Sequence, residues 1–317
     1  TNILNHNRRF VNPKNRIFRP TVLFFRLFPR KNIMNLGKSK IKIACVFRRF
    51  IILYVRKYNK FIGADMELQK LLSKARRAVE DYGMIEEGDK IAVGLSGGKD
   101  SITLLYILAT MRRFYPKKYE VMAISVDMGL GLDEKEVQAV KDLCAALNVE
   151  YVIEPTHIGE IVFDVRQEPN PCSLCANMRR GALNNTAVKC GCNKVALGHH
   201  ADDLIETLFL SLFYESRLST FSPVTTLERK NIKVIRPMIY IREKEIASFA
   251  KDKPIIHNPC PADKHTRRQY IKDLLKTLEK DNKKIKENVL GAITHPERNG
   301  LFGNKITFGE TGSDENR

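Results

Sequence analysis

The stretch "KIAVGLSGGKDS", residues 90–101, joins a short apolar run directly to a turn that contains two glycines. The run at 90–95 predicts a buried strand, and apolar residues three and four positions apart after Ser101 predict a helix. Gly97 and Gly98 let the backbone of such a turn approach an anion closely, and the helix N-terminus offers free N–H groups to it. The stretch therefore predicts a phosphate-binding loop at the carboxyl end of a strand.

This loop differs from a Walker A motif in two positions. Val93 stands where the first glycine of that motif would be, and Lys99 is followed by Asp100 instead of Ser or Thr. A plain Gly-Gly turn with a capping serine is the alternative interpretation. It would explain the serine and the glycines, but it would not explain a Lys-Asp-Ser sequence at the carboxyl end of a parallel strand, where ligands of open α/β sheets bind.

Strand and helix patterns alternate along the chain after this loop. The alternation is typical of β-α-β units and predicts an α/β fold with a parallel sheet. The expected elements are strands at 90–95, 121–127, 150–155 and 194–200 and helices at 66–84, 101–113 and 134–148.

The first 65 residues have a different composition from the rest. They hold 16 of the 54 Lys and Arg residues and one acid, Asp65, which leaves 38 bases against 35 acids in residues 66–317. The overall charge of +18 therefore lies mostly in this basic N-terminal extension. We expect it to lie outside the working domain at 66–290, as an organellar transit peptide or a basic RNA-binding arm. Residues 291–317 have little apolar periodicity, and we expect a loose tail there.

A second motif, "LGHHADDLIETLFLSLF" at residues 197–213, places Gly198 and His199 at a strand end. Asp202 and Asp203 open the helix that follows. One acid could simply cap that helix, but two acids beside two histidines favour a functional role. Helical spacing predicts that these acids lie at the helix mouth, outside its buried stripe. The expected stripe is Leu204, Ile205, Leu208, Phe209, Leu212 and Phe213.

The chain has seven cysteines, an odd number that argues against a disulfide framework. Cys144 falls on the apolar stripe of a predicted helix, and we expect it in the core. The pair Cys190 and Cys192 precedes a predicted strand, and packing is favoured there over metal binding. Cys45 belongs to the basic extension.

Cys172 and Cys175 form a C-x-x-C pair that follows two prolines and opens a helix, where a thiolate is favoured. A structural zinc site would need two further ligands at standard spacing, and the sequence shows none. Cys260 also precedes a predicted helix. Three thiolates from distant loops suit an iron–sulfur cluster with one open iron, since such clusters normally take four cysteines. Zinc, or a dithiol that carries a persulfide, is the alternative.

Taken together, "SGGKDS" at 96–101, the G-H-x-x-D-D pattern at 198–203 and "PCSLC" at 171–175 carry a family resemblance. The sequence resembles the PP-loop ATP pyrophosphatase superfamily and, within it, the tRNA 2-thiocytidine biosynthesis family. This resemblance implies an adenine-nucleotide α-hydrolase-like, Rossmann-like domain with C-terminal helices. It also implies that ATP is cleaved between its α and β phosphates.

The resemblance further implies a set of site residues and cofactors. The nucleotide-binding positions are Ser96, Gly97, Gly98, Lys99, Asp100, Ser101, Asp127, Gly198 and His199. The catalytic positions, which act with magnesium, are Lys99, Asp100, Asp202 and Asp203. The ligands of a 4Fe-4S cluster are Cys172, Cys175 and Cys260. Basic residues near these cysteines are interpreted as tRNA phosphate contacts. They are Arg179, Arg180, Arg267 and Arg268, with Lys264 and Lys272 beside them.

The predicted function is that of an ATP-dependent tRNA sulfurtransferase. It would adenylate the carbonyl oxygen of a cytidine in the anticodon loop and exchange that oxygen for sulfur. The expected partners are tRNA, a sulfur donor of the cysteine-desulfurase type and a second copy of the chain, in the cytoplasm and without a membrane. The alternatives are thiolation of uridine, a lysidine-type tRNA ligase, and a non-enzymatic iron–sulfur RNA sensor that only binds ATP.

Overall fold

The computed structural model describes residues 66–167, 171–256 and 267–300. The chain divides into two compact units, Thr1–Gly63 and Ala64–Arg317, and all described residues belong to the second. The basic extension, Cys45, Cys260 and Lys264 lie outside the described residues.

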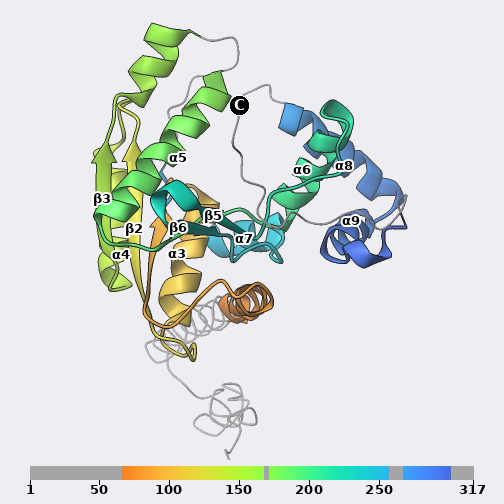
Figure 1. Cartoon of the computed structure of the whole chain (residues 1–317), viewed down its shortest axis with the longest axis horizontal. Coiled ribbons are helices and arrows are strands. Elements are labelled where there is room, and N and C mark those ends of the chain that lie inside the picture. The colour runs from red at the N-terminus through yellow and green to blue at the C-terminus, as the bar shows by residue number, and fades with distance from the viewer. Residues whose placement is uncertain (1–65, 168–170, 257–266, 301–317) are drawn as a thin grey trace, which may run out of the picture. The chain divides into compact units, whose positions relative to one another are not determined.

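The described residues form one six-stranded sheet with the order β3-β2-β1-β4-β6-β5 (Figure 1). Neighbouring strands pair in parallel except for β5 and β6, which form an antiparallel pair at one edge. The predicted α/β fold with a mostly parallel sheet is therefore confirmed. The strands are β1 Asp89–Gly94, β2 Tyr119–Asp127, β3 Glu150–Pro155, β4 Lys194–Ala196, β5 Val224–Leu227 and β6 Ile232–Ile235.

A helix at residues 66–81 precedes the sheet, and further helices connect and follow the strands. These are α3 Lys99–Met111, α4 Glu134–Ala146, α5 Pro171–Lys189, α6 Ala201–Tyr214, α7 Glu243–Ala250, α8 Arg267–Asp281 and α9 Ile285–Thr294. A short π-helical segment, Glu160–Arg166, lies between β3 and α5. Within the described ranges, no helix is both long and apolar enough to cross a membrane.

Helices cover both faces of the sheet because its strands are apolar on both sides. On β1, Ile91 and Val93 join a cluster with α3 and α4, whereas Ala92 between them joins a second cluster with α5. The alternation follows from the two-residue period of a strand. The sheet is thus held in register from both sides, and its carboxyl edge is left for the loops.

That edge has a switch point between β1 and β4. The chain runs from β1 outward to β2 and β3, and then returns to place β4 on the other side of β1. Loops that leave the carboxyl ends of two such strands diverge, and the crevice between them is where open α/β sheets bind ligands. The phosphate loop follows β1 and the Gly-His-His sequence follows β4, so the fold brings the two sequence motifs together.

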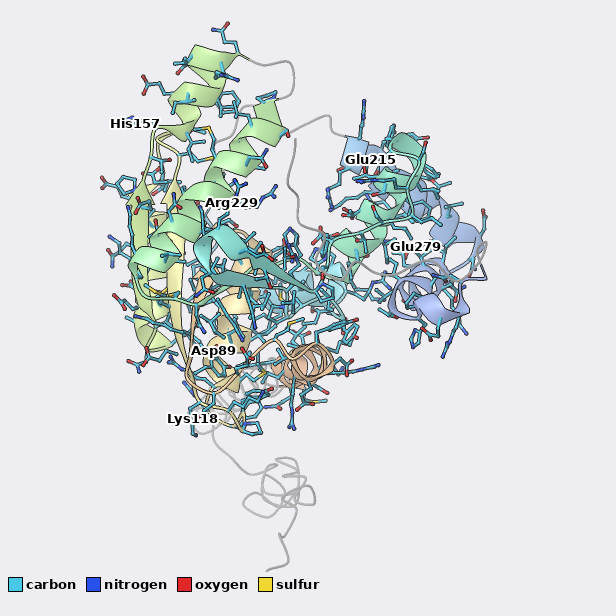
Figure 2. The ribbon with its side chains drawn as sticks, in the orientation of Figure 1. Asp89, Lys118, His157, Glu215, Arg229 and Glu279 are labelled. Carbon is cyan, nitrogen blue, oxygen red and sulfur yellow. The ribbon has the colours of Figure 1, made fainter. Side chains whose placement is uncertain are left out.

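A buried ion pair fixes β4 to β1 at the opposite end of the strands. The Lys194 Nζ atom lies 2.7 Å from Asp89 Oδ2 and 2.8 Å from Glu86 Oε2 and also donates to the carbonyl of Met84 (Figure 2 labels Asp89). Both Lys194 and Asp89 are buried, and a buried charge is tolerated only when it is paired in this way. The pair therefore supports the register that aligns the two functional loops.

Several sequence expectations need correction. The predicted strand at 194–200 ends at Ala196, because the chain must then turn to bring Gly198 against the start of α3. A Cβ at Gly198 would lie 3.1 Å from the carbonyl carbon of Asp100 and 3.2 Å from the nitrogen of Ser101. Only a glycine fits that approach without displacement. Strands β5 and β6 were absent from the predicted elements.

The predicted buried stripe of α6 is correct only in its first half. Ile205 packs against Ile271 and Leu275 of α8, but Leu212 and Phe213 are 42% and 49% exposed. Helices α8 and α9 cover only the first turns of α6, which is why the end of the stripe reaches solvent. The predicted loose tail from residue 291 also starts too early, because α9 continues to Thr294 and Ile293 packs on α6 and α8.

Candidate active site

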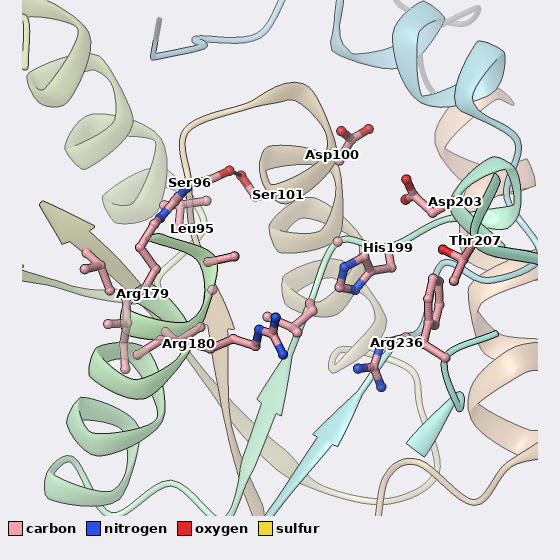
Figure 3. Close-up of a pocket in the computed structure, with 18 of the residues that line it drawn as sticks. Leu95, Ser96, Asp100, Ser101, Arg179, Arg180, His199, Asp203, Thr207 and Arg236 are labelled. Atoms are coloured by element: carbon pink, nitrogen blue, oxygen red, sulfur yellow. Dashed lines mark hydrogen bonds between the residues drawn. The ribbon is translucent and has the colours of Figure 1, made fainter. Parts of the chain in front are cut away.

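A cavity of about 630 Å³ opens at the switch point between β1 and β4 (Figure 3). Its walls come from the carboxyl ends of β1, β2, β4 and β6 and from α5, α6 and α8. It brings together nine of the predicted site residues, which are Ser96, Asp100, Ser101, Arg179, Arg180, Gly198, His199, Asp203 and Arg268.

The phosphate loop forms one end of this cavity. Gly97 has a φ of +79°, and Gly98 precedes α3 with no side chain to cap the helix. The Ser96 and Ser101 hydroxyls lie 3.2 Å apart, and Ser101 Oγ donates to the carbonyl of Gly98. A helix N-terminus with uncapped N–H groups beside two hydroxyls is a site for an anion. The geometry agrees with the predicted phosphate site.

Lys99 lies beside the loop but does not line the cavity. Its Nζ atom is 3.2 Å from Asp100 Oδ2 and 3.0 Å from Glu243 Oε1 of α7. Burial works against the charge on this side chain, but the two carboxylates outweigh it and raise the pKa of Lys99 above its usual value. The lysine is therefore a fixed positive charge at the edge of the phosphate loop.

His200 lies between two acids of the site. It is buried and caps α6. Its Nδ1 atom accepts a hydrogen bond from the backbone nitrogen of Asp203, and the backbone nitrogen of His200 donates to Asp203 Oδ2. Its Nε2 atom is 3.7 Å from Asp100 Oδ1, a buried oxygen that has no hydrogen-bond partner among the described residues. Carboxylate oxygens are the ligands that Mg²⁺ prefers, and magnesium binding by Asp100 and Asp203 stays a prediction, because no group of three or more potential ligands among the described residues could hold a metal.

Positive side chains line the rest of the cavity, and they differ in how they are paired. Arg179 and Arg180 project from α5 into the cavity (Figure 3), and no carboxylate of the described residues lies within ion-pair distance of them. Arg268 of α8 pairs with Asp203 at 3.4 Å and with buried Glu206 at 3.0 Å. Arg267 is not a lining residue, and its guanidinium packs over the ring of Tyr214.

Asp127, another predicted nucleotide ligand, ends β2 and does not line the cavity. Its Oδ1 atom accepts a hydrogen bond from the backbone nitrogen of Gly129 at 2.9 Å, which stabilises the turn after the strand. Lys272 also lies outside the lining residues and pairs with Glu206 and Glu243. The predicted ligand roles of these two residues therefore stay predictions.

The C-x-x-C pair lies in the first turn of α5, as predicted. Cys172 is exposed, Cys175 lies near Met128, and Ala176, the next residue, lines the cavity. The third predicted ligand, Cys260, is outside the described residues, and within those residues no group of three or more potential ligands could hold a metal. The thiol pair thus borders the cavity but forms only part of the predicted set.

The other described cysteines match their predicted structural roles. Cys144 and Cys192 are buried, and burial raises the pKa of each thiol to about 11. Cys192 packs against Met122, and its neighbour Cys190 packs at the edge of the same apolar cluster.

Comparison with known proteins identifies the family. A family model described as a PP-loop domain matches residues 66–278. The chain belongs to the PP-loop family. A tRNA-cytidine(32) 2-sulfurtransferase of Geotalea uraniireducens (strain Rf4) is 37% identical over 77% of this chain and 98% of that protein. One of Geobacter sulfurreducens is 39% identical over 72% of this chain and 90% of its own length. The predicted resemblance is confirmed.

The PP-loop fold is also seen among solved structures. The U34-tRNA thiolase NcsA from Methanococcus maripaludis, solved with its [4Fe-4S] cluster, aligns with a TM-score of 0.60 and 24% sequence identity. The alignment covers 74% of this chain and 79% of that chain. At this identity the likeness supports the fold, and it agrees with the six-stranded sheet described above.

Asp202 lies in the first turn of α6 as predicted, but its side chain is buried instead of facing the cavity. It is 5% exposed and contacts Arg242 through two hydrogen bonds of 3.1 and 3.2 Å. Burial alone would raise its pKa, but the bonds from Arg242 and from the backbone of Glu243, with the charge of Lys286, hold the pKa of Asp202 at about 2. The carboxylate joins α6 to α7 and α9, away from the cavity.

Among the ten cavity residues that were not predicted from the sequence, three have polar or aromatic side chains. They are Thr207 of α6, Phe221 before β5 and Arg236 directly after β6. A polar residue at the carboxyl end of an apolar run is a usable signal in an α/β fold, and Arg236 follows the run "IKVI". Thr207 and Phe221 carry no such local signal.

Replacing Gly97 with alanine is expected to lower ATP affinity by about 10-fold or more, since an alanine at positive φ is strained by about 1–2 kcal/mol. A Cβ there would also lie 2.8 Å from Cγ1 of Ile256, whose backbone nitrogen bonds the carbonyl of Gly97. Gly191→Ala is the matched control, because its φ is +74° but its Cβ would meet nothing within 4 Å. Equal ATP affinities of the two variants in titration calorimetry would contradict the expectation.

Proposed function

We propose that the chain is an ATP-dependent tRNA sulfurtransferase that converts a cytidine to 2-thiocytidine. The observation that carries the proposal is one cavity that joins an uncapped phosphate loop, two arginines without an ion-pair partner among the described residues, and the edge of a C-x-x-C helix. The relatives named tRNA-cytidine(32) 2-sulfurtransferase support it, because the chain covers 98% of one and 90% of another.

The proposed reaction has two steps, adenylation of the base and replacement of its oxygen by sulfur. The C2 oxygen of the cytosine attacks the α-phosphorus of ATP, and pyrophosphate leaves. A sulfide then attacks C2, and the oxygen departs with AMP. In the first step the N–H groups of α3 and the hydroxyls of Ser96 and Ser101 stabilise the charge that grows on the pyrophosphate. Lys99 adds positive charge, and Asp100 and Asp203 would hold Mg²⁺.

The thiol pair fits two positions of a 4Fe-4S site. Cys172 and Cys175 are three residues apart at the start of α5, so both lie on one side of the helix near the cavity. With Cys260 they would supply three of the four ligands that such a cluster normally takes. When bound, the cluster supplies a place for the incoming sulfur, and the chain's part is to hold it beside the cavity.

The proposal also implies partners and a location. Arg179 and Arg180, which form no ion pair within the described part of the chain, favour the phosphates of a tRNA anticodon loop. A loop presents an unstacked base at lower cost than a duplex does. We further propose a sulfur donor of the cysteine-desulfurase type, assembly as a homodimer, and action in the cytoplasm. An organelle that holds its own tRNA is the alternative location, because of the basic extension.

Mass spectrometry of nucleosides from total tRNA tests this function. Deletion of the gene is expected to remove 2-thiocytidine, and the wild-type chain and Cys190→Ser are expected to restore it. Cys172→Ser is expected to restore none, because Cys172 is an exposed thiol at the cavity edge whereas Cys190 packs against the core. Loss of a different thionucleoside would assign the chemistry to another base, such as uridine. An unchanged nucleoside profile would contradict a role in tRNA modification.

A further inference from the structure

Among the described residues, the buried side-chain atoms that lack a hydrogen-bond partner are concentrated in the cavity. Of five buried side-chain atoms of the described residues that lack a hydrogen-bond partner, four belong to cavity residues. These are Asp100 Oδ1, His199 Nδ1, Thr207 Oγ1 and Arg236 Nε. Buried polar atoms are nearly always paired in folded proteins. Such a cluster indicates a polar ligand that supplies the missing partners.

Three of these atoms lie apart from the phosphate loop, in what we call the His199 corner, formed by His199, Thr207, Phe221 and Arg236 (Figure 3). The His199 ring is 4.9 Å from the ring of Phe221, and the Arg236 guanidinium lies 5.2 Å from the same ring. An aromatic wall with polar atoms at its edge is the arrangement by which proteins recognise an unstacked nucleobase.

Arg236 is held by hydrogen bonds that leave its buried Nε–H donor without a partner among the described residues. Its Nη1 atom donates to the carbonyl of Ser222 at 2.7 Å and to Thr225 Oγ1 at 3.1 Å, while Nε has no partner. Among the described residues no carboxylate forms an ion pair with Arg236, and burial and the nearby Arg180 lower its pKa to about 10. The guanidinium is therefore held in place by two acceptors, and its buried Nε–H still lacks one among the described residues.

His199, unlike Arg236, can accept a hydrogen bond. Burial, and then the charge of Arg236, lower its pKa to about 4, so the ring is neutral at pH 7. A neutral imidazole accepts a hydrogen bond at one nitrogen, and the Thr207 hydroxyl can accept as well. The corner thus combines Arg236, which can only donate hydrogen bonds, with His199 and Thr207, which can accept them.

This pattern matches cytosine when the donor faces N3 and the acceptors face the exocyclic group, whereas the reverse order would match uracil. Cytosine accepts at N3 and donates from its exocyclic amino group, whereas uracil donates from N3 and accepts at O4. We propose that the His199 corner is the subsite for the target base, in place of the nucleotide-binding role predicted for His199, and that it selects cytidine over uridine. Arg236 donates to N3 of the base, and His199 and Thr207 accept from the two N–H bonds of its amino group. The inference rests on the proposed function and names the residues behind its base specificity.

The test uses the full-length chain with its cluster reconstituted and two tRNA transcripts that differ only by cytidine or uridine at the target position. Thr207→Val is expected to lower kcat/KM for the cytidine tRNA about 10-fold, the effect of one buried hydrogen bond. Thr186→Val is the matched control, because Thr186 Oγ1 is also buried and unpaired but lies outside the cavity. It should behave as the wild type does.

Arg236→Gln tests selection directly. A glutamine amide can donate to N3 of cytosine or accept from N3–H of uracil. The preference for cytidine over uridine, measured as the ratio of kcat/KM for pyrophosphate release, is therefore expected to fall at least about 10-fold. ATP affinity without tRNA should be unchanged in all three variants, and melting temperatures report whether each variant folds.

Three results would overturn the subsite. They are an unchanged preference in Arg236→Gln, a Thr207→Val variant that matches Thr186→Val, and a loss of ATP affinity in the corner variants, which would assign the corner to the nucleotide. A wild-type chain that releases no pyrophosphate with either tRNA would instead overturn the proposed function, and the subsite with it.

Discussion

Replacing Asp202 with asparagine is expected to destabilise the fold by about 3–5 kcal/mol, the range for breaking a buried ion pair. Asp202 and Arg242 are both nearly buried, and the change would leave the guanidinium without its strongest partner. Lys286 of α9 also lies 3.4 Å from Asp202 Oδ1, and Arg242 contacts Glu287 at 2.7 Å. The variant therefore loosens α7 and α9 together. Chemical unfolding measures this loss.

Asp203→Asn is the matched comparison, since the two acids are adjacent on the same helix. Asp203 lines the cavity, and its carboxylate pairs with the partly exposed Arg268 and accepts from the backbone of His200. Asparagine can still accept that capping bond, so we expect a stability loss of about 1 kcal/mol or less. Turnover of ATP should be lost, because the amide cannot replace a carboxylate as a magnesium ligand. If Asp202→Asn instead folds normally and loses only turnover, the assignment of the two acids is wrong.

The pH dependence of the Asp202 effect gives an independent check. The folded pKa of this carboxyl, about 2, lies below the ordinary value of 3.8, so its contribution to stability is complete above pH 4. It is lost as the pH falls toward 2. The difference in unfolding free energy between the wild type and Asp202→Asn should therefore be constant near neutral pH and shrink below pH 4. A difference that grows in acid would contradict the pairing.

The second large effect is expected at Lys99. Replacement by methionine should lower ATP turnover by about 100- to 1000-fold, the usual result of removing one fixed positive group that stabilises developing charge. The side chain is held by Asp100 and Glu243, which keep it charged beside the helix N-terminus that we propose binds the pyrophosphate. Lys99→Arg should recover part of the rate, because it keeps the charge but alters its position.

Pyrophosphate release in the presence of tRNA measures the Lys99 effect. Lys141→Met on the exposed side of α4 removes the same charge far from the loop and should change the rate less than twofold, as surface substitutions usually do. Because Lys99→Met also leaves two carboxylates facing each other, its melting temperature must be compared as well. A folded Lys99→Met protein with unchanged turnover would exclude the lysine from the reaction.

The local chemistry of the site could be predicted from the sequence. The phosphate loop needs only a strand, two glycines and a helix start, and these are properties of neighbouring residues in "KIAVGLSGGKDS". The C-x-x-C pair at the start of α5 and the core position of Cys144 follow from helical spacing in the same way. The parallel sheet follows from the alternation of these local patterns, and so does the meeting of both motifs at one edge.

Only the tertiary structure separated Asp202 from Asp203. Both acids lie in the first turn of α6, and the sequence offers no difference between them. The difference arises because Arg242 and Lys286, at least 40 residues away, meet one side of that helix while the cavity opens on the other. The His199 corner has the same origin, since it joins α6 to the ends of β5 and β6. Local residue patterns determine which groups are available, but long-range packing decides which of them are paired and buried and which face the substrate.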